Sequence, residues 1–327
     1  MTIAIPTFNR AAKLERLLTV LQEDITTSQL QERVVVLVSD NASTDETPSM
    51  LSQFADFDLR LEYYRQPENL GFDGNLRFLY AHVNTPYLWF MADDDYPLTG
   101  AVNKVVRALE AHEPDVLLFS FIQPPGSTVR QFDFPESVRL VTEPVLAIEY
   151  VLRYTKVSIF IVRKVSFEAS QGQVLDENIG AGWYYISLAF SVLETSPSLR
   201  LAVISEALAT CDEDYSLITT NPESLLRMGI VVQHPFVMKH SPNLPKFYRD
   251  EGYYSAIQFA FAVKCGALPP EYPEEYDKFI KELECRICTL FRCPRSLFQF
   301  MALKLRISRL WPLIKPKVRY LMSKIRV

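Results

Sequence analysis

The chain has 327 residues, of which 48% are hydrophobic and 22% charged, and its net charge is −5. This composition is typical of a globular protein with a substantial core, and it excludes a disordered or fibrous chain. Five cysteines, an odd number, favour a reducing compartment over a disulfide scaffold. Because "MTIAIPTFNR" lacks a signal-peptide pattern and no apolar window reaches about 18 residues, we expect a cytoplasmic protein.

The first 121 residues alternate between predicted strands and predicted helices. "TIAIP" and "RVVVLVSD" are typical of buried strands, and the leucines between them recur at helical spacing. Ser43 and Glu46 then match the S-x-x-E capping box of a helix. "LRLEYY", "PYLWFMA" and "DVLLFSF" predict three more strands, with a helix in each interval, the second capped by Thr99. This alternation predicts a largely parallel sheet with right-handed crossovers.

After Phe121 the alternation is less regular. "KVSIFIVRK" predicts a strand, "GWYYISLAFSVLE" a buried helix, and "RLAVIS" and "ALATC" two short strands. From Pro222 onward the pattern is helical and rich in proline. We therefore expect an α/β domain over 1–221, with halves 1–121 and 122–221, and a helical C-terminal extension over 222–327.

Polar side chains gather where the predicted strands end. In an open parallel sheet, ligands bind at the carboxyl ends of the strands. The residues at these four ends are Pro6, Thr7, Phe8 and Asn9, then Asp40 and Asn41, then Asn69 and Gly71, and finally Asp93, Asp94 and Asp95. Their convergence on one edge indicates a ligand site.

The three adjacent aspartates repel one another and need a counter-charge. Asp93 and Asp95 could share a hard divalent cation, because Mg²⁺ and Mn²⁺ prefer oxygen ligands and also bind phosphate oxygens. The alternative is an acidic loop that caps the next helix, since carboxylates stabilise helix N-termini. At the end of the fourth strand of such a sheet, we favour the metal site.

Four stretches of this chain resemble a known family. "IAIPTFNR", "VVVLVSDNASTDET", "NLGFDGN" and "YLWFMADDD" occur in the order and approximate spacing of family 2 glycosyltransferases with the GT-A fold. They are most similar to the abequosyltransferase-like bacterial branch, which builds surface polysaccharides such as O-antigen. The resemblance covers residues 1–121. It implies a nucleotide-diphosphate sugar donor (UDP-, CDP-, GDP- or dTDP-linked), a glycan or lipid-linked glycan acceptor, Mn²⁺ or Mg²⁺, and inversion at the anomeric carbon.

The resemblance also implies roles for individual residues. The donor-binding residues that it assigns are Pro6, Thr7, Phe8, Asn9, Asp40, Asn41, Asn69, Gly71, Asn75, Asp93 and Asp94. Among them Pro6 to Phe8 lie against the base and Asp40 accepts a hydrogen bond from it, while Asp93 and Asp95 hold the metal on the diphosphate. Three of these residues have a structural role as the alternative: helix capping for Asp40, packing for Phe8 and an internal hydrogen bond for Asn75.

The catalytic base is the weak point of the resemblance. The family carries an acidic pair just before a helix in the second half, but here "LDENIGAGWYYI" has glycines and alanine at that place. Asp176 and Glu177, a few residues upstream, are the candidate bases, and Asp212 and Asp214 either face the acceptor or decorate a loop. The missing pair leaves open a non-catalytic nucleotide-sugar-binding module. A sugar nucleotidyltransferase is disfavoured, because no glycine-rich basic loop follows the first strand.

The last residues of the chain are basic. Residues 286–327 contain eleven Lys or Arg and no Asp or Glu. With interspersed apolar side chains, this tail could bind the anionic cytosolic face of a membrane, which suits a lipid-linked acceptor, or it could pack on the core as a solvated helix. No nucleic-acid module accompanies the charge. The cysteines at 285, 288 and 293 lack the partners of a zinc site.

Overall fold

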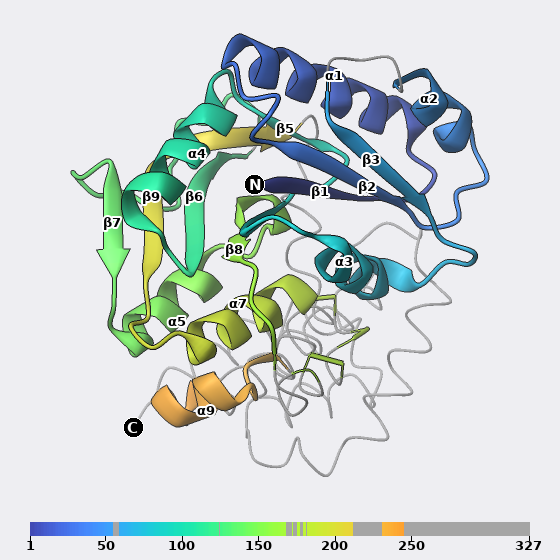
Figure 1. The fold of residues 1–327 in the computed structure, drawn as a ribbon. Helices are drawn as coiled ribbons and strands as arrows, with labels where there is room; N and C mark the ends of the chain where they lie inside the picture. The colour runs from blue at the N-terminus through green and yellow to red at the C-terminus, as the bar shows by residue number, and fades with distance from the viewer. Residues whose placement is uncertain are drawn as a thin grey trace, which may run out of the picture. The chain divides into compact units, whose positions relative to one another are not determined.

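The computed structural model describes residues 1–54, 59–123, 125–167, 172, 175–176, 179–180, 182–211 and 231–244. The strands are β1 (Thr2–Thr7), β2 (Val35–Asp40), β3 (Leu61–Arg65), β4 (Tyr87–Phe90), β5 (Asp95–Pro97), β6 (Val116–Ile122), β7 (Val138–Val141), β8 (Ile161–Arg163) and β9 (Leu201–Cys211). The helices are α1 (Ala11–Thr27), α2 (Thr47–Gln53), α3 (Gly71–His82), α4 (Ala101–His112), α5 (Pro144–Arg153), the short 3₁₀ helix η2 (Val157–Ile159), α7 (Tyr184–Thr195) and α9 (Pro235–His240) (Figure 1).

The first four strands form the parallel half of one sheet, in the order β3-β2-β1-β4. Every residue of β1 and β2 is buried, because helices cover both faces of these strands. Helices α1 and α2 lie on one face and α3 on the other (Figure 1). The strand order therefore reverses between β1 and β4, which makes a topological switch point at their carboxyl ends.

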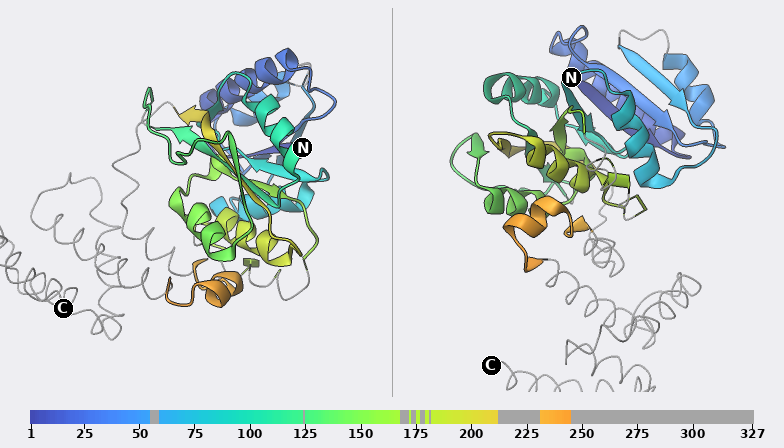
Figure 2. Two further views of the ribbon diagram at one scale, coloured as in Figure 1. Left: turned by 90° about the vertical axis from the view of Figure 1, so that its left-hand side faces the viewer. Right: turned by 60° about the horizontal axis from the view of Figure 1, so that its bottom comes forward.

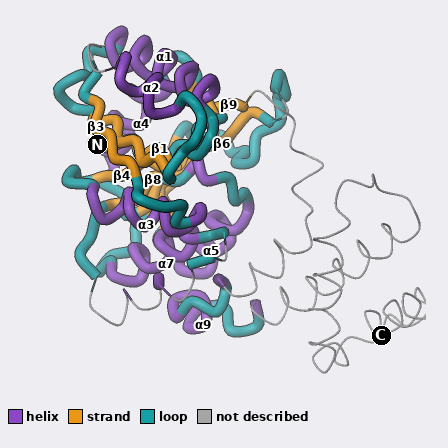
Figure 3. The backbone as a smooth tube through the Cα atoms, turned by 90° about the vertical axis from the view of Figure 1, so that its right-hand side faces the viewer, coloured by secondary structure: helices purple, strands orange, loops and turns teal. Residues whose placement is uncertain are grey.

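The second half of the sheet is mixed. Strand β8 runs antiparallel between β4 and β6, β6 is parallel to β9, and β5 and β7 are each antiparallel to β9. Helix α7 packs against β6 and β8, and α5 and α9 pack against α7 (Figure 2). The sheet runs through the middle of the α/β domain, with helices on either side (Figure 3). The predicted parallel order thus holds for β1 to β4 and gives way to mixed pairing beyond them.

Several elements of the second half differ from the sequence-based expectation. "RLAVIS" and "ALATC" form one strand, β9, whose pairing with β6 shifts register between Phe119 and Phe121. "KVSIFIVRK" begins with η2 and has only a three-residue strand. Strand β5, which starts at Asp95, and the segment with β7 and α5 were not predicted. These elements depend on pairing with distant strands, which no local pattern reveals.

Two predicted helix caps are wrong. The N-cap residue of helix α2 is Glu46, whose side chain makes no capping bond, and Asp45 Oδ1 accepts from the Thr47 amide at 3.0 Å. Ser43 Oγ instead accepts a hydrogen bond from the Asn9 amide at 2.9 Å. Thr99 does not cap α4. The carboxylate of Asp24, which comes from α1, accepts hydrogen bonds from the amides of Gly100 and Val102. At α4 a partner from another element replaces the predicted cap, whereas at α2 the predicted capping residue bonds to another segment instead.

Residues 1–219 and 230–242 form one compact unit, so α9 belongs with the α/β domain. Most of the predicted extension, including the basic tail 286–327, lies outside the described residues. Among the residues that the structure does describe, no helix has the length and apolarity needed to cross a membrane.

Candidate functional site

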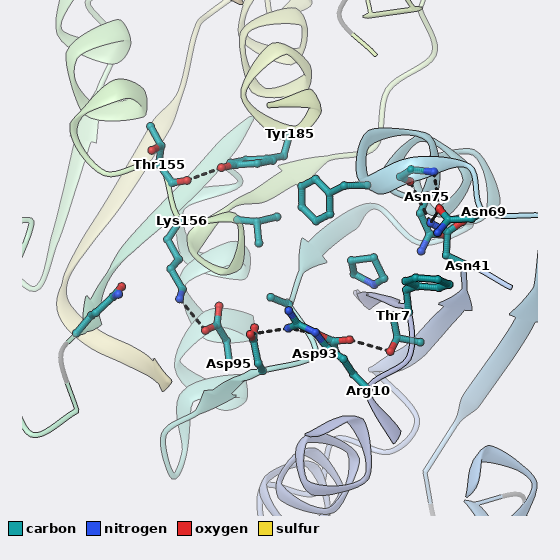
Figure 4. Close-up of a pocket in the computed structure, with 18 residues that line it drawn as sticks. Thr7, Arg10, Asn41, Asn69, Asn75, Asp93, Asp95, Thr155, Lys156 and Tyr185 are labelled. Carbon is teal, nitrogen blue, oxygen red and sulfur yellow. Dashed lines mark hydrogen bonds and ion pairs between the residues drawn. The ribbon is translucent and has the colours of Figure 1, made fainter. Parts of the chain in front are cut away.

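A cavity of about 650 Å³ opens at the carboxyl ends of β1 and β4, at the switch point (Figure 4). It is lined by Pro6, Thr7, Phe8, Arg10, Asn41, Asn69, Gly71, Phe72, Asn75, Ala92, Asp93, Asp94, Asp95, Gln123, Thr155, Lys156, Val157 and Tyr185. Most of the predicted donor-binding residues therefore line the same cavity.

Three asparagines shape one end of this cavity. The Asn41 side chain donates to Asn69 Oδ1 at 2.8 Å and to the Gly71 carbonyl at 3.2 Å, and its own Oδ1 accepts from the Leu70 amide. These bonds tie the end of β2 to the loop before α3. Gly71 has φ +73°, a left-handed conformation in which a side chain is strained. The chain thus enters α3 with its backbone exposed to the cavity.

Asn75 and Phe8 offer contacts to a ligand at this end. The Asn75 side chain is 2% exposed and donates to the Ser39 carbonyl at 3.0 Å, while its Oδ1 has no hydrogen-bond partner among the described residues. Phe8 is 41% exposed, which is unusual for so large an apolar ring. Asn75 therefore makes the predicted internal bond through its Nδ2, while its Oδ1 could contact a ligand.

The acidic cluster forms the floor, and basic side chains hold it. Thr7 Oγ1 donates to Asp93 Oδ2 at 2.8 Å. Arg10 Nη1 lies 3.1 Å from Asp93 Oδ1 and 2.6 Å from Asp94 Oδ2. One guanidinium group therefore bridges two of the three carboxylates.

Asp95 is held from the second half of the domain. Ser158 Oγ donates to Asp95 Oδ2 at 2.5 Å, and Lys156 Nζ lies 2.9 Å from Asp95 Oδ1 (Figure 4). Both partners come from the segment that begins η2. Sequence reasoning missed them, because their stretch reads as a strand. Arg10 and Lys156 thus supply the counter-charge that three adjacent aspartates require.

Burial raises the pKa of Asp93 and of Asp95 to about 6, although Arg10 and Lys156 oppose this rise. Asp93 is 5% exposed and Asp95 is fully buried, so the charged form of each loses its hydration. The two carboxyls are therefore partly protonated in mildly acidic solution.

Raising the pH from about 4.5 to about 7 in a chelator is expected to lower the contribution of Asp93 and Asp95 to the free energy of unfolding. The folded pKa near 6 lies above the ordinary value of 3.8, so the folded state binds protons more tightly and loses stability as the carboxyls ionise. Two pKa units correspond to at most about 3 kcal/mol per carboxyl. Urea unfolding at the two pH values measures this change. Asp93→Asn removes one titrating group and should flatten the dependence; equal pH slopes in both proteins would contradict the shift.

Asp40 and Asn9 do not reach the cavity wall. Asp40 is fully buried; its Oδ1 accepts from the Ser43 amide at 2.8 Å, and its Oδ2 lies 3.3 Å from the Tyr63 hydroxyl and 3.6 Å from Arg65 Nε. Asn9 Oδ1 accepts from the Thr44 amide at 2.7 Å. Both side chains hold the loop after β2 in place, and the base contact assigned to Asp40 stays a prediction.

Asp176, one of the two candidate bases, does not line the cavity. Asp176 is half exposed and forms a two-point ion pair with Arg77 of α3, at 2.8 and 3.0 Å. Glu177 lies outside the described residues, as do Asp212 and Asp214. The role of Asp176 and Glu177 therefore stays a prediction.

Sequence reasoning overlooked Asp73, which organises the segment before α7. This buried side chain accepts hydrogen bonds from the backbone amides of Gly180 at 2.8 Å, Gly182 at 2.6 Å and Tyr184 at 3.1 Å. The carboxylate thereby caps the N-terminus of α7 from α3. A single acid in "GFDGN" looks like a local capping residue, so its long-range role leaves no signal in the sequence.

Tyr185, on the first turn of α7, lines the cavity at the end away from the asparagines (Figure 4). Its hydroxyl donates to the Thr155 carbonyl, which precedes Lys156. Asp73 therefore positions a residue of the cavity wall as well as a helix end.

The donor set of Asp93 and Asp95 suits a hard divalent cation in chemical kind, because both residues offer buried carboxylate oxygens. Within the described ranges no group of three or more His, Cys, Asp and Glu side chains is arranged to hold a metal ion. An ion bound by these two residues would compete with Arg10 and Lys156 for their oxygens.

Residues 2–163 match the family described as Glycosyl transferase family 2. Two curated bacterial proteins are similar over shorter stretches. A GalNAc(5)-diNAcBac-PP-undecaprenol beta-1,3-glucosyltransferase of Campylobacter jejuni is 26% identical over 133 residues, which are 40% of this chain and 41% of that protein. The abequosyltransferase RfbV of Salmonella typhimurium is 31% identical over 96 residues, 29% of this chain and 28% of its own. The chain thus spans less than half the length of either relative.

Solved structures resemble the fold of this chain over almost its whole length. The crystal structure of S. aureus TarS 1-349 matches 98% of this chain and 91% of its own length, with a TM-score of 0.58 and 15% identity. The structure of the same protein in complex with UDP-GlcNAc gives a TM-score of 0.59 at 15% identity, over the same shares of the two chains. This likeness confirms the predicted GT-A-type sheet flanked by helices.

Proposed function

Because this chain belongs, through residues 2–163, to glycosyl transferase family 2, we propose that it transfers a sugar from a nucleotide-diphosphate donor to a glycan or lipid-linked glycan. The observation that carries the proposal is the cavity at the switch point, in which asparagines and aromatic rings stand at one end and an acidic cluster forms the floor. Bacterial surface polysaccharide synthesis is the proposed setting, since both curated relatives have bacterial glycosyltransferase names.

A nucleotide-diphosphate sugar would lie along the length of this cavity. The base and ribose would lie at Phe8 and the three asparagines. There the exposed ring of Phe8 could stack on the base, and Asn75 Oδ1, which is buried without a hydrogen-bond partner among the described residues, could accept a hydrogen bond. The diphosphate would lie over Asp93 to Asp95, and the sugar beyond it, toward Lys156 and Tyr185. TarS, which shares the fold, has been crystallised with UDP-GlcNAc and with UDP.

The charge of the floor favours a divalent cation on the diphosphate. Within the part of the chain that the structure describes, the three carboxylates pair with two cationic side chains, Arg10 and Lys156, and a divalent cation would offset the repulsion between ionised carboxylates and a diphosphate. Asp93 and Asp95 would hold Mn²⁺ or Mg²⁺. When bound, the ion stabilises the negative charge that develops on the departing nucleoside diphosphate.

The acceptor hydroxyl needs a base, and Asp176 and Glu177 remain the proposed candidates. The acceptor would enter at the Tyr185 end, beside the segment that Asp73 holds. To act, Asp176 has to leave its ion pair with Arg77. Attack from the face opposite the diphosphate would invert the anomeric carbon.

We also propose that the tail 286–327 attaches the protein to the anionic cytosolic face of a membrane. Its eleven basic residues without an acid support this proposal. Sedimentation of the full chain and of a chain ending at residue 285 with anionic vesicles is the relevant measurement.

A donor panel tests the proposed function. UDP-, CDP-, GDP- and dTDP-linked sugars are each added with Mn²⁺, and the apparent melting temperature is recorded. One donor is expected to raise it, because a ligand of the folded state stabilises that state. Turnover of that donor, by transfer or slow hydrolysis, should then disappear when EDTA removes the metal.

The outcomes separate the alternatives. Stabilisation by a donor without turnover under any acceptor favours the non-catalytic module. Release of pyrophosphate from a nucleoside triphosphate and a sugar phosphate favours the nucleotidyltransferase. If turnover occurs, Asp176→Asn and Glu177→Gln distinguish the two bases, since only loss of the base should abolish turnover while nucleotide binding persists.

A further inference from the structure

Lys156 is an unusual lysine for a protein surface. Its side chain is only 18% exposed, and its ammonium group lies 2.9 Å from Asp95 Oδ1 and 4.6 Å from the centre of the Phe121 ring. It also lines the cavity. Lysine is usually solvated at its tip, so a largely buried ammonium beside a fully buried carboxylate needs an explanation.

The backbone holds Lys156 in this position independently of the ion pair. Two residues later, Ser158 donates to Asp95 Oδ2 and accepts a hydrogen bond from the Ala92 amide at 2.9 Å. The Ser158 carbonyl accepts from the Trp89 indole at 2.8 Å. The start of η2 is therefore fixed against the end of β4, and a cation at position 156 always stands over the acidic floor.

A metal ion and the Lys156 ammonium compete for the same oxygen. A divalent cation on Asp95 would stand within a few ångströms of Nζ, and like charges at that distance repel strongly in a buried site. The ammonium would then be released from Asp95. Because Lys156 lines the cavity, an anionic group that enters the cavity with the ion would come within reach of its ammonium group.

We propose that Lys156 occupies Asp95 in the metal-free protein and binds the phosphate oxygens of the donor once the cation is in place. This inference rests on the proposed function, because it takes a nucleotide diphosphate as the ligand. Lys156 is then a donor-binding residue contributed by the second half of the domain, opposite Arg10, which comes from the first.

The proposal predicts effects of opposite sign for one substitution. Lys156→Met removes a competitor of the ion, so Mn²⁺ should bind about 10-fold more tightly in the absence of nucleotide. The same change removes a phosphate contact, so the nucleoside diphosphate should bind about 10-fold to 30-fold more weakly at saturating Mn²⁺. A purely structural lysine would weaken both affinities or neither.

Two further variants serve as controls. Lys104→Met removes the same charge at an exposed ion pair with Glu206, at 2.6 Å, and should change neither affinity by more than about twofold. Lys156→Arg keeps the charge and should keep nucleotide affinity within a few-fold of the wild-type value. If Lys156→Met does not fold, as judged by circular dichroism, Lys156→Gln replaces it.

The measurements need no turnover. Free Mn²⁺ is followed by electron paramagnetic resonance, and binding of UDP, CDP, GDP or dTDP, whichever stabilises the protein most, by calorimetry at fixed salt. Tighter Mn²⁺ together with weaker nucleotide in Lys156→Met supports the proposal. If the wild-type protein binds both ligands and Lys156→Met leaves both affinities unchanged or shifts both in the same direction, the role of Lys156 is overturned while the proposed function stands. Wild-type protein that binds neither ligand overturns the proposed function and this inference together.

Discussion

Replacing Asp95 by Asn is expected to lower kcat/KM for sugar transfer by about 1000-fold, or about 4 kcal/mol, while the domain stays folded. Asn has nearly the shape of Asp and can still accept the hydrogen bond from Ser158 Oγ. It lacks the negative charge that a divalent cation requires of its ligand, so metal binding and charge neutralisation on the diphosphate are lost together.

Asp94→Asn is the matched control for this substitution. It removes the same charge one residue away, from a side chain that pairs with Arg10 and is not a proposed metal ligand. Mn²⁺ affinity should fall by at least about 100-fold in Asp95→Asn but by less than about 10-fold in Asp94→Asn. Unfolding curves of both variants establish that they are folded. Equal losses in the two would mean that net charge, and not ligation by Asp95, governs the site.

The parallel half of the fold could be predicted from the sequence because its signals are local. Strands β1 and β2 are covered on both faces and therefore appear as continuous apolar runs, and amphipathic helices separate them. Parts of the second half lack such a signal. Strands β5 and β7 are three and four residues long and exist because β9 pairs with both.

The candidate site divides in the same way. The position at the cavity of Pro6, Thr7, Phe8, Asn41, Asn69, Gly71 and the three aspartates was predictable from the order of the strand ends. Asn9 and Asp40 were predicted in the same way but do not line the cavity, and Asn75 was assigned by the family resemblance. Lys156, Ser158 and Asp73 were not, since each acts on a partner at least 60 residues away in the chain. A lysine at the head of an apolar run was the one available sign that position 156 is special.

Local capping signals failed for a related reason. The Ser43 hydroxyl accepts a hydrogen bond from the Asn9 amide in the loop after β1, and the Asp24 carboxylate accepts one from the Val102 amide at the start of α4. A capping box describes what a side chain can do within its own segment. In a packed domain, a buried amide from elsewhere competes for the same oxygen, and leaving that amide unpaired costs more.

Replacing Asp73 by Ala is expected to lower kcat by about 100-fold per folded molecule and to destabilise the domain by about 3 kcal/mol. The change leaves the amides of Gly180, Gly182 and Tyr184 without their acceptor. The Tyr184 bond is buried and the two glycine bonds are part-buried, so the amides that lose this charged partner either stay unpaired, at a cost in stability, or move toward water. Because this segment leads into Tyr185 at the cavity wall, its movement should disturb the acceptor end and spare the nucleotide end.

Asp24→Ala provides the comparison that isolates the role of position. Asp24 is also a buried carboxylate that accepts amides at the start of a helix, from Gly100 and Val102 of α4, but it does not line or adjoin the cavity. Both variants should lose similar free energy of unfolding in urea. Only Asp73→Ala should lose turnover while its affinity for the nucleoside diphosphate stays within about threefold of the wild-type value. A matching loss of kcat in Asp24→Ala would show that general stability, and not the position of the segment before α7, limits the reaction.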